Sequence, residues 1–157
     1  MLIRFLLSTL FTLSAVEAVG QVQKYENRGA LGDMPFSESV RAGDLLFVSG
    51  QVGTDFSGDL VEGGITPEAH QVMRNIRDIV YRRGLTMNDI VKCTVFLADV
   101  SKWGDFNQVY ISYFSKPYPA RSALGANGLA LGAALEVECI AAYPQRPEPR
   151  PMNDERS

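Results

Sequence analysis

Two carboxylates near the end of the chain are spaced for proton transfer at one place. Glu136 and Glu138 lie two residues apart in an otherwise apolar run, a spacing that puts both side chains on the same face of a β-strand. A carboxyl group in a poorly solvated cleft has a raised pKa and can exchange protons near neutral pH. The alternative is a pair of solvated or ion-paired carboxylates at a sheet edge, which is the commoner case for such a pattern alone.

Arg121 is the second candidate for a functional side chain. This residue follows a Pro119-Ala120 turn and precedes a short extended segment. An arginine in such a place can hold a substrate carboxylate through two parallel N–H bonds. A surface or structural ion pair is the alternative, so the residues by themselves leave both interpretations open.

Other common chemistries have little support. His70 is the only histidine, and we place it on the surface of a predicted helix, which leaves a serine or cysteine nucleophile without a base. The glycines do not have the spacing of a dinucleotide or phosphate loop. Cys93 and Cys139 each lie in a run typical of a buried strand, and neither has a nearby cysteine or histidine partner. We therefore predict no metal site and favour two free, buried thiols, with a disulfide as the alternative in an exported protein.

The composition excludes one class of partner. The chain has 157 residues, enough for one domain, with 46% hydrophobic and 21% charged residues. Its formal net charge is -3, and no segment concentrates lysine and arginine. Because binding to a phosphate backbone requires clustered basic residues, we expect no nucleic-acid partner.

The N-terminus has the three-part layout of a secretory signal. Arg4 precedes an apolar run from Phe5 to Val16, and Val16-Glu17-Ala18 offers small residues for a signal peptidase. We predict a signal peptide over residues 1–18, with a second possible cut after Gly20, and a periplasmic or secreted protein. The run is too short to span a bilayer, so no stable membrane anchor is expected after cleavage. An uncleaved anchor or a misassigned start is the alternative.

The rest of the chain divides into a polar lead-in, a folded domain and a tail. Residues 19–34 form the lead-in with room for one edge strand, residues 35–143 the domain, and residues 144–157 a proline-rich segment predicted to be disordered. Hydrophobic periodicity and turn residues predict two helices and four main strands. The first helix is expected to start with Thr66 as N-cap and to end at Gly84. The predicted strands are 36–41, 45–49, 89–97 and 135–143, and the predicted helices are 66–84 and 101–114.

This order predicts an α+β fold, a β-β-α-β-α-β sheet with two helices on one face. The runs Leu45–Val48 and Val95–Leu97 are apolar at consecutive positions, so both faces of the sheet carry apolar side chains. Two helices can cover only one face. We therefore predict that the other face is buried against further copies of the chain.

Five segments resemble those of the RidA/YjgF family, in the same order. They are a strand end with Ser-Gly-Gln, a central strand, a helix with Asn and Tyr three residues apart, the Pro-Ala-Arg-Ser signature and a terminal strand with two glutamates. The resemblance extends from Pro35 to Ala142. The segments are Phe47–Gln51, Asp89–Asp99, Phe106–Tyr110, Pro119–Ser122 and Glu136–Ala141.

The resemblance implies a chorismate-mutase-like homotrimer with a pocket at each subunit interface. It makes Arg121 the group that binds the substrate carboxylate, with help from the backbone N–H of Ala123, where the family often has cysteine. Glu136 would position water, and Ser49, Gly50 and Asn107 occupy places that line the pocket. Phe36 stands where many deaminase members have tyrosine, so a hydroxyl that could orient substrate or water is missing.

The activity that the resemblance implies is hydrolysis of small 2-imino or enamino acids to 2-keto acids and ammonia, with no cofactor and no metal. Two alternatives come from other classes: a non-catalytic binder of small carboxylates that uses the same cleft, and a chaperone-like trimer. A nuclease role, attached to some relatives, disagrees with the acidic charge.

Overall fold

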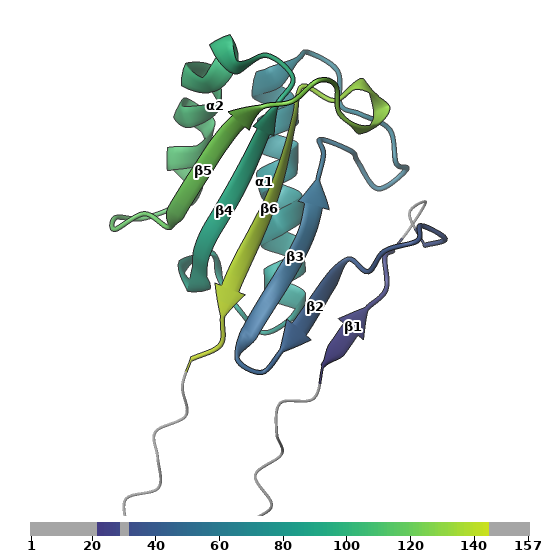
Figure 1. Cartoon of the computed structure of the whole chain (residues 1–157), viewed down its shortest axis with the longest axis vertical. Helices are drawn as coiled ribbons and strands as arrows, with labels where there is room; N and C mark the ends of the chain where they lie inside the picture. Colours follow the sequence, from purple (N-terminus) through teal and green to yellow (C-terminus); the bar gives the residue numbers. More distant parts are fainter. Residues whose placement is uncertain (1–21, 29–31, 145–157) are drawn as a thin grey trace, which may run out of the picture.

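The computed structural model of the protein describes residues 22–28 and 32–144, which form one sheet with two helices packed on one side of it (Figure 1). The predicted signal peptide and residues 145–157 of the predicted tail lie outside the described residues. No helix in the described part is long and apolar enough to cross a membrane. The elements are β1 (Gln23–Tyr25), β2 (Ser39–Ala42), β3 (Leu45–Gln51), α1 (Ile65–Arg82), β4 (Ile90–Leu97), α2 (Trp103–Tyr110), β5 (Ala120–Gly125) and β6 (Leu135–Ala142), with short 3-10 turns at Met87–Asp89, Val100–Lys102, Ile111–Tyr113 and Ala130–Gly132.

The last strand of the sequence lies inside the sheet. The strand order is β1-β2-β3-β6-β4-β5, and every neighbouring pair is antiparallel except β4 with β5. The parallel connection from β4 to β5 contains α2, as such connections require a crossover. Because β6 pairs with β3 on one side and β4 on the other, its two glutamates stand at the middle of the sheet and not at an edge.

The predicted fold class is confirmed, with three local corrections. The extended segment around Arg121 is a full edge strand, β5, which the pattern did not reveal because most of its side chains are exposed and do not alternate. The strand predicted from Phe36 begins only at Ser39. Helix α1 begins at Ile65 with Gly64 as its N-cap, not at Thr66, because Gly64 adopts the positive φ of 79° that turns the chain into the helix.

The end of α1 agrees with the prediction. Gly84 follows the C-cap residue Arg83 with φ of 76°, a conformation that glycine adopts without steric penalty. Its N–H donates to the carbonyl of Tyr81, and the N–H of Leu85 donates to that of Val80. These two bonds satisfy free carbonyls of the last turn, so the helix ends where the glycine stands.

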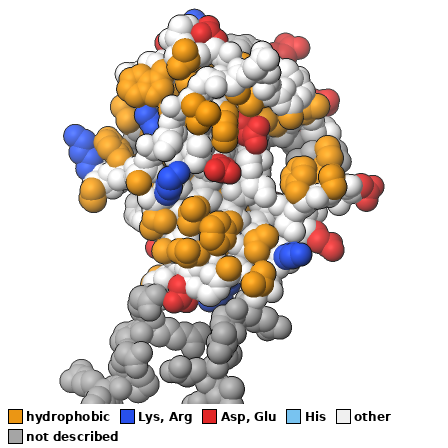
Figure 2. Space-filling model, viewed as in Figure 1, with side chains coloured by type: hydrophobic (Ala, Val, Ile, Leu, Met, Phe, Trp, Pro, Cys, Tyr) orange, Lys and Arg blue, Asp and Glu red, His pale blue; other side chains and the backbone are white. Residues whose placement is uncertain are grey.

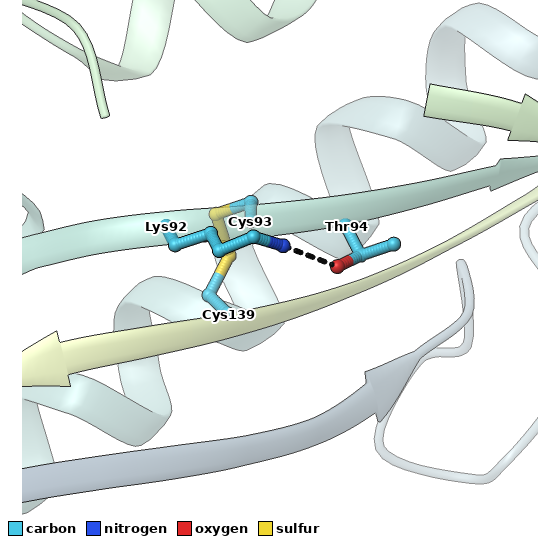
Figure 3. The surroundings of a disulfide bond; sticks show 4 residues. All are labelled: Lys92, Cys93, Thr94 and Cys139. Atoms are coloured by element: carbon cyan, nitrogen blue, oxygen red, sulfur yellow. Dashed lines mark hydrogen bonds between the residues drawn. A yellow bond between two sulfur atoms is a disulfide. The ribbon is translucent and has the colours of Figure 1, made fainter. Parts of the chain in front are cut away.

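The core lies between the helices and one face of the sheet. Alternate residues of β3, β4 and β6 point toward α1 and α2 and are almost fully buried. Cys93 of β4 and Cys139 of β6 are directly paired across the strands and form a disulfide within this core, so the prediction of two free thiols was wrong (Figure 3). Burial was predicted correctly, but the sequence could not reveal that the two strands are neighbours in matching register.

Within residues 22–28 and 32–144, no helix covers the opposite face of the sheet (Figure 1). Leu45 and Phe47 of β3 and Leu124 of β5 are 38%, 42% and 44% exposed, although leucine and phenylalanine usually lie inside. Figure 2 views this open face and shows hydrophobic side chains spread over the sheet, with a few acidic and basic ones among them. We call this surface the open face.

Two buried glutamates hold the starts of β2 and β6 against α1. Glu38, just before β2, forms ion pairs with Arg82 and Arg83 at the end of α1, where cations are favoured. Glu68 in the first turn of α1 accepts a 2.8 Å hydrogen bond from the N–H of Ala134, just before β6. These contacts fix the starts of β2 and β6 against the same helix.

Candidate functional site

The side chain of Arg121 is held firmly on the helix side of β5. Its Nη2 donates a 2.7 Å hydrogen bond to Oδ1 of Asn107 on α2. Its guanidinium carbon lies 4.6 Å from the ring centre of Tyr110 and also near the rings of Trp103 and Phe106. Stacking on aromatic faces and one fixed hydrogen bond orient the planar group, which leaves its other N–H donors free to meet an anion.

A cavity of about 370 Å³ opens beside this arginine. Asn107, Tyr110 and Arg121 line it together with Ile111, Tyr118 and Pro119. Tyr110 is buried, and its hydroxyl has no hydrogen-bond partner within the described residues. Burial raises the pKa of Tyr110, although the nearby charge of Arg121 acts in the opposite direction, so this hydroxyl keeps its proton at neutral pH.

Glu136 lies on the open face, closely opposed to Gly50 at the end of β3. A Cβ atom at position 50 would stand 1.8 Å from Oε1 of Glu136, a distance at which atoms overlap. Glycine is therefore required here if the carboxylate keeps its place, since any other side chain would push it away.

The protonation of Glu136 is perturbed in the direction that general acid–base chemistry needs. Partial burial raises its pKa above the ordinary 4.5, and the neighbouring charge of Glu138 raises the pKa further. The two carboxylates share a face, as predicted, with Leu135, Val137 and Cys139 buried on the other side. The structure disagrees with the alternative of ion-paired carboxylates at a sheet edge. Both glutamates lie on a central strand, and neither makes an ion pair within the described residues.

The hydroxyl of Ser49 is already engaged. It donates a 2.7 Å hydrogen bond to the carbonyl of Ser37, which attaches the segment after Phe36 to the end of β3 beside Gly50. Phe36 itself is 49% exposed, outside any strand. Ser49 also lines a hollow of about 230 Å³ on the open face, together with Phe47, Lys92, Thr94 and Glu138.

Arg121 and Glu136 lie on opposite faces of the sheet in one chain. Arg121 pairs with Cys93, whose side chain is buried under the helices, whereas Glu136 pairs with Phe96, which points to the open face. Directly paired residues project to the same side of a sheet. One group of predicted site residues, Arg121 with Asn107, therefore gathers at α2, and a second group, Glu136 with Gly50 and Ser49, gathers at the end of β3.

Several residues of these two groups were not predicted. The sequence analysis placed Tyr110 only in the helix segment Phe106–Tyr110 that resembles the family, and it assigned no role to Tyr118, Lys92 or Thr94. For Lys92 and Thr94 a signal existed, since they alternate with buried residues of β4 and so had to face away from the helices. The Lys92 amine donates to Thr94 Oγ1 at 3.0 Å, on the side of β4 away from Cys93 (Figure 3).

Three further expectations can be compared with the structure. Ala123 is an exposed residue of the edge strand β5, in register with Val95 of β4. His70 is not a surface residue as predicted but half-buried, because its ring packs on Tyr113 and its Nδ1 lies 3.1 Å from the Tyr113 hydroxyl. Among the described residues no group of three or more metal-ligating side chains occurs.

Comparison with known proteins identifies relatives over nearly the whole described part. Residues 30–143 match the family model described as Endoribonuclease L-PSP. The 2-iminobutanoate/2-iminopropanoate deaminase of Mus musculus is 41% identical over 108 residues, which cover 68% of this chain and 80% of the mouse protein. The human protein of the same name is 38% identical over 114 residues, with 72% and 82% covered.

Solved structures show the same fold. Yeast Mmf1 matches with a TM-score of 0.73 and 31% identity, covering 79% of this chain and all of the yeast chain. RidA from the Antarctic bacterium Psychrobacter sp. PAMC 21119 matches with a TM-score of 0.68 and 34% identity, covering 79% of this chain and 98% of the bacterial one. The arrangement of sheet and helices is thus that of a known group of proteins.

Proposed function

Since the chain belongs to the Endoribonuclease L-PSP family, also called RidA/YjgF, we propose that it hydrolyses small 2-imino acids to 2-keto acids and ammonia. The observation that carries the proposal is that the chain holds both an oriented guanidinium, Arg121, and a carboxyl of raised pKa, Glu136. Relatives that share about two fifths of their residues with this chain are named for the same reaction.

The reaction needs little more than positioning. Water adds to the carbon of the C=N bond and gives a tetrahedral aminoalcohol. The C–N bond then breaks, ammonia leaves with the electron pair and a proton, and C=O forms. A 2-imino acid hydrolyses slowly in water alone, so an enzyme must hold the substrate and aim one water molecule.

Each group has one part in this scheme. The free N–H donors of Arg121 bind the substrate carboxylate, and Asn107 with Tyr110 holds the guanidinium plane in the required orientation. Glu136 accepts a proton from the attacking water and returns one to the leaving nitrogen, a role that suits a carboxyl with a pKa raised toward neutrality. No step requires a metal or an organic cofactor.

The two groups act together only if copies of the chain assemble, because they occupy opposite faces in one chain. We propose a homotrimer in which β5 of one copy meets the open face of the next near Gly50 and Glu136. The uncovered apolar side chains of that face support this assembly, since contact with another copy would remove them from water. Each site would then contain Arg121 from one copy and Glu136 from its neighbour.

Two variants test the proposed function. Arg121→Lys should lower kcat/KM by roughly a hundredfold or more, because a point charge cannot replace the planar two-donor fork and the reacting carbon is misplaced. Glu136→Gln should keep affinity for a stable keto acid and lose turnover, because the amide has nearly the same shape but accepts no proton. Ammonia release from imines generated by an amino-acid oxidase measures turnover, and calorimetry with pyruvate measures binding. Wild-type turnover in both variants would end the proposal.

A non-catalytic binder of small carboxylates is the second candidate. Phe36 has no hydroxyl, and the hydroxyl of Ser49 donates to a backbone carbonyl, so neither side chain has a hydroxyl proton left to orient water. A binder predicts no turnover in the wild-type protein and a loss of affinity only in Arg121 variants. The imine assay on the wild type separates the two candidates. We do not propose a nuclease, because the net charge of -3 opposes binding to a phosphate backbone.

We further propose that the protein is exported. The signal-like pattern of residues 1–18 supports export, and so does the Cys93–Cys139 disulfide, since disulfides persist mainly in oxidising compartments. N-terminal sequencing of the protein from its native host should find Val19 or Gln21 first. An intact Met1 in the cytoplasmic fraction would contradict export.

A further inference from the structure

The residues that line the cavity beside Arg121 indicate which kind of imino acid the protein binds. It measures about 370 Å³, within the range of pockets that hold ligands larger than a three-carbon acid. One end is fixed by Arg121, whose guanidinium is oriented by Asn107 and by the ring of Tyr110. A substrate carboxylate bound there places the rest of the molecule among the remaining lining residues.

Those remaining residues are mostly apolar. Ile111 and Tyr118, which line the cavity together with Pro119, are 45% and 43% exposed in one copy of the chain. Gln108 adds one neutral amide to the lining. A bound apolar side chain would cover this surface and remove it from water.

Charge gives a second argument. Among the described residues of one copy that line the cavity, none carries a carboxylate, and Arg121, the one basic residue, is already used by the substrate carboxylate. A basic or acidic side chain of the substrate would therefore lose its hydration without gaining a partner in the cavity.

We infer that the cavity formed by Tyr110, Ile111, Tyr118 and Pro119 receives the substrate side chain and selects 2-imino acids with bulky apolar, above all aromatic, side chains. This inference rests on the proposed function, and it names the substrate class of that same site. Ile111 and Tyr118 are the specificity-determining residues, and Asn107 is the positioning residue that sets the direction of Arg121.

Kinetics on a panel of imines tests the inference. Imines derived from alanine, leucine, phenylalanine, arginine and glutamate are generated by amino-acid oxidases and supplied to the full-length, assembled protein. Covering a phenyl group should raise kcat/KM for the phenylalanine-derived imine roughly ten- to hundredfold over the alanine-derived one. The arginine- and glutamate-derived imines should fall below the leucine-derived one.

Variants locate the preference. Tyr118→Ala and Ile111→Ala should each raise KM for the phenylalanine-derived imine about tenfold more than KM for the alanine-derived imine, because the larger side chain contacts them. Tyr81→Ala is the matched control, since Tyr81 is 54% exposed on α1 and lies outside the cavity. Two independent cavity variants keep the test informative if one of them fails to fold.

The outcomes separate this inference from the proposed function. Turnover of all imines without preference, or a preference unchanged in both cavity variants, overturns the inference and leaves the proposed function standing. If no imine is turned over, the proposed function fails. Calorimetry with 3-phenyl-2-oxopropanoate and pyruvate then tests whether the cavity binds an apolar side chain. Tighter binding of the phenyl compound, lost in Tyr118→Ala, would support the cavity as an apolar subsite, and equal binding would overturn it.

Discussion

Gly50 and Glu136 approach each other so closely that no side chain at position 50 is compatible with the observed carboxylate. The added Cβ would meet the far end of a flexible side chain, 1.8 Å from Oε1 and 2.8 Å from Cδ. The carboxylate can swing away at little cost to the fold. A substitution at position 50 should therefore move the Glu136 carboxylate without destabilising the sheet.

Gly50→Ala should keep the fold and lose activity. We expect a melting temperature within a few degrees of wild type and a loss in kcat of at least about tenfold, because a displaced carboxylate no longer aims the water. Gly104→Ala on α2 is the control, since a Cβ there meets nothing within 4 Å and alanine favours the helix. Thermal melts and imine turnover on both variants provide the measurement. Full activity in Gly50→Ala would remove Glu136 from the mechanism.

The pH dependence should report the raised pKa of Glu136. As a base the group must be deprotonated, so the rate should rise with pH through a pKa that burial and Glu138 hold above 4.5. Glu138→Gln removes the neighbouring charge, which should lower that pKa and move the acidic limb of the pH–rate profile to lower pH. An unmoved limb would show that the limb belongs to another group.

The same raised pKa has a consequence for stability. The folded protein binds the Glu136 proton more tightly than the unfolded chain does, so protonation of Glu136 adds to the free energy of unfolding. This added stability is fully present below the unfolded pKa. It is lost as the pH rises through the folded pKa. Unfolding titrations of wild type and Glu136→Gln across this range should show that the difference between them changes with pH in that direction.

The Cys93–Cys139 disulfide should stabilise the sheet considerably. It joins β4 to β6 across a sequence separation of 46 residues, for which chain entropy gives about 4 kcal/mol. The double variant Cys93→Ala, Cys139→Ala should melt at least about 10 °C lower than the oxidised protein. Reductant applied to the unfolded and refolded wild type should reproduce the loss and leave the double variant unaffected. Two titratable thiols in denatured, unreduced protein would contradict the bond.

Disrupting the open face should disrupt assembly and activity together. Phe47→Glu puts a charge on a half-exposed apolar position that also lies by Glu138, so we expect sedimentation equilibrium to report a smaller species and turnover to fall at least about tenfold. Phe56→Glu is the control, since Phe56 is 84% exposed in a loop before α1. A fully active monomer would exclude a site shared between copies.

Local patterns were sufficient for much of the molecule. Helical spacing and Gly84 located α1, alternation placed Glu136 and Glu138 on one face, and consecutive apolar residues in two strands indicated a second face in need of cover. The Pro119–Ser122 motif, which contains Arg121, indicated a family in which several relatives are named 2-iminobutanoate/2-iminopropanoate deaminase. Each of these features depends on residues within about a turn or a strand of one another, where the chemistry of neighbours decides the outcome.

Pairing over long range was decided only by the tertiary structure. Nothing in the sequence placed β6 between β3 and β4, joined Cys93 to Cys139, or showed that the extended segment at Arg121 is an edge strand of the sheet. The sequence predicted Arg121 and Glu136 as residues of one site, but it did not reveal that they face opposite sides of the sheet. Strand order and register arise from contacts between segments far apart in the chain, and no local spacing encodes which face of which neighbour a side chain will meet.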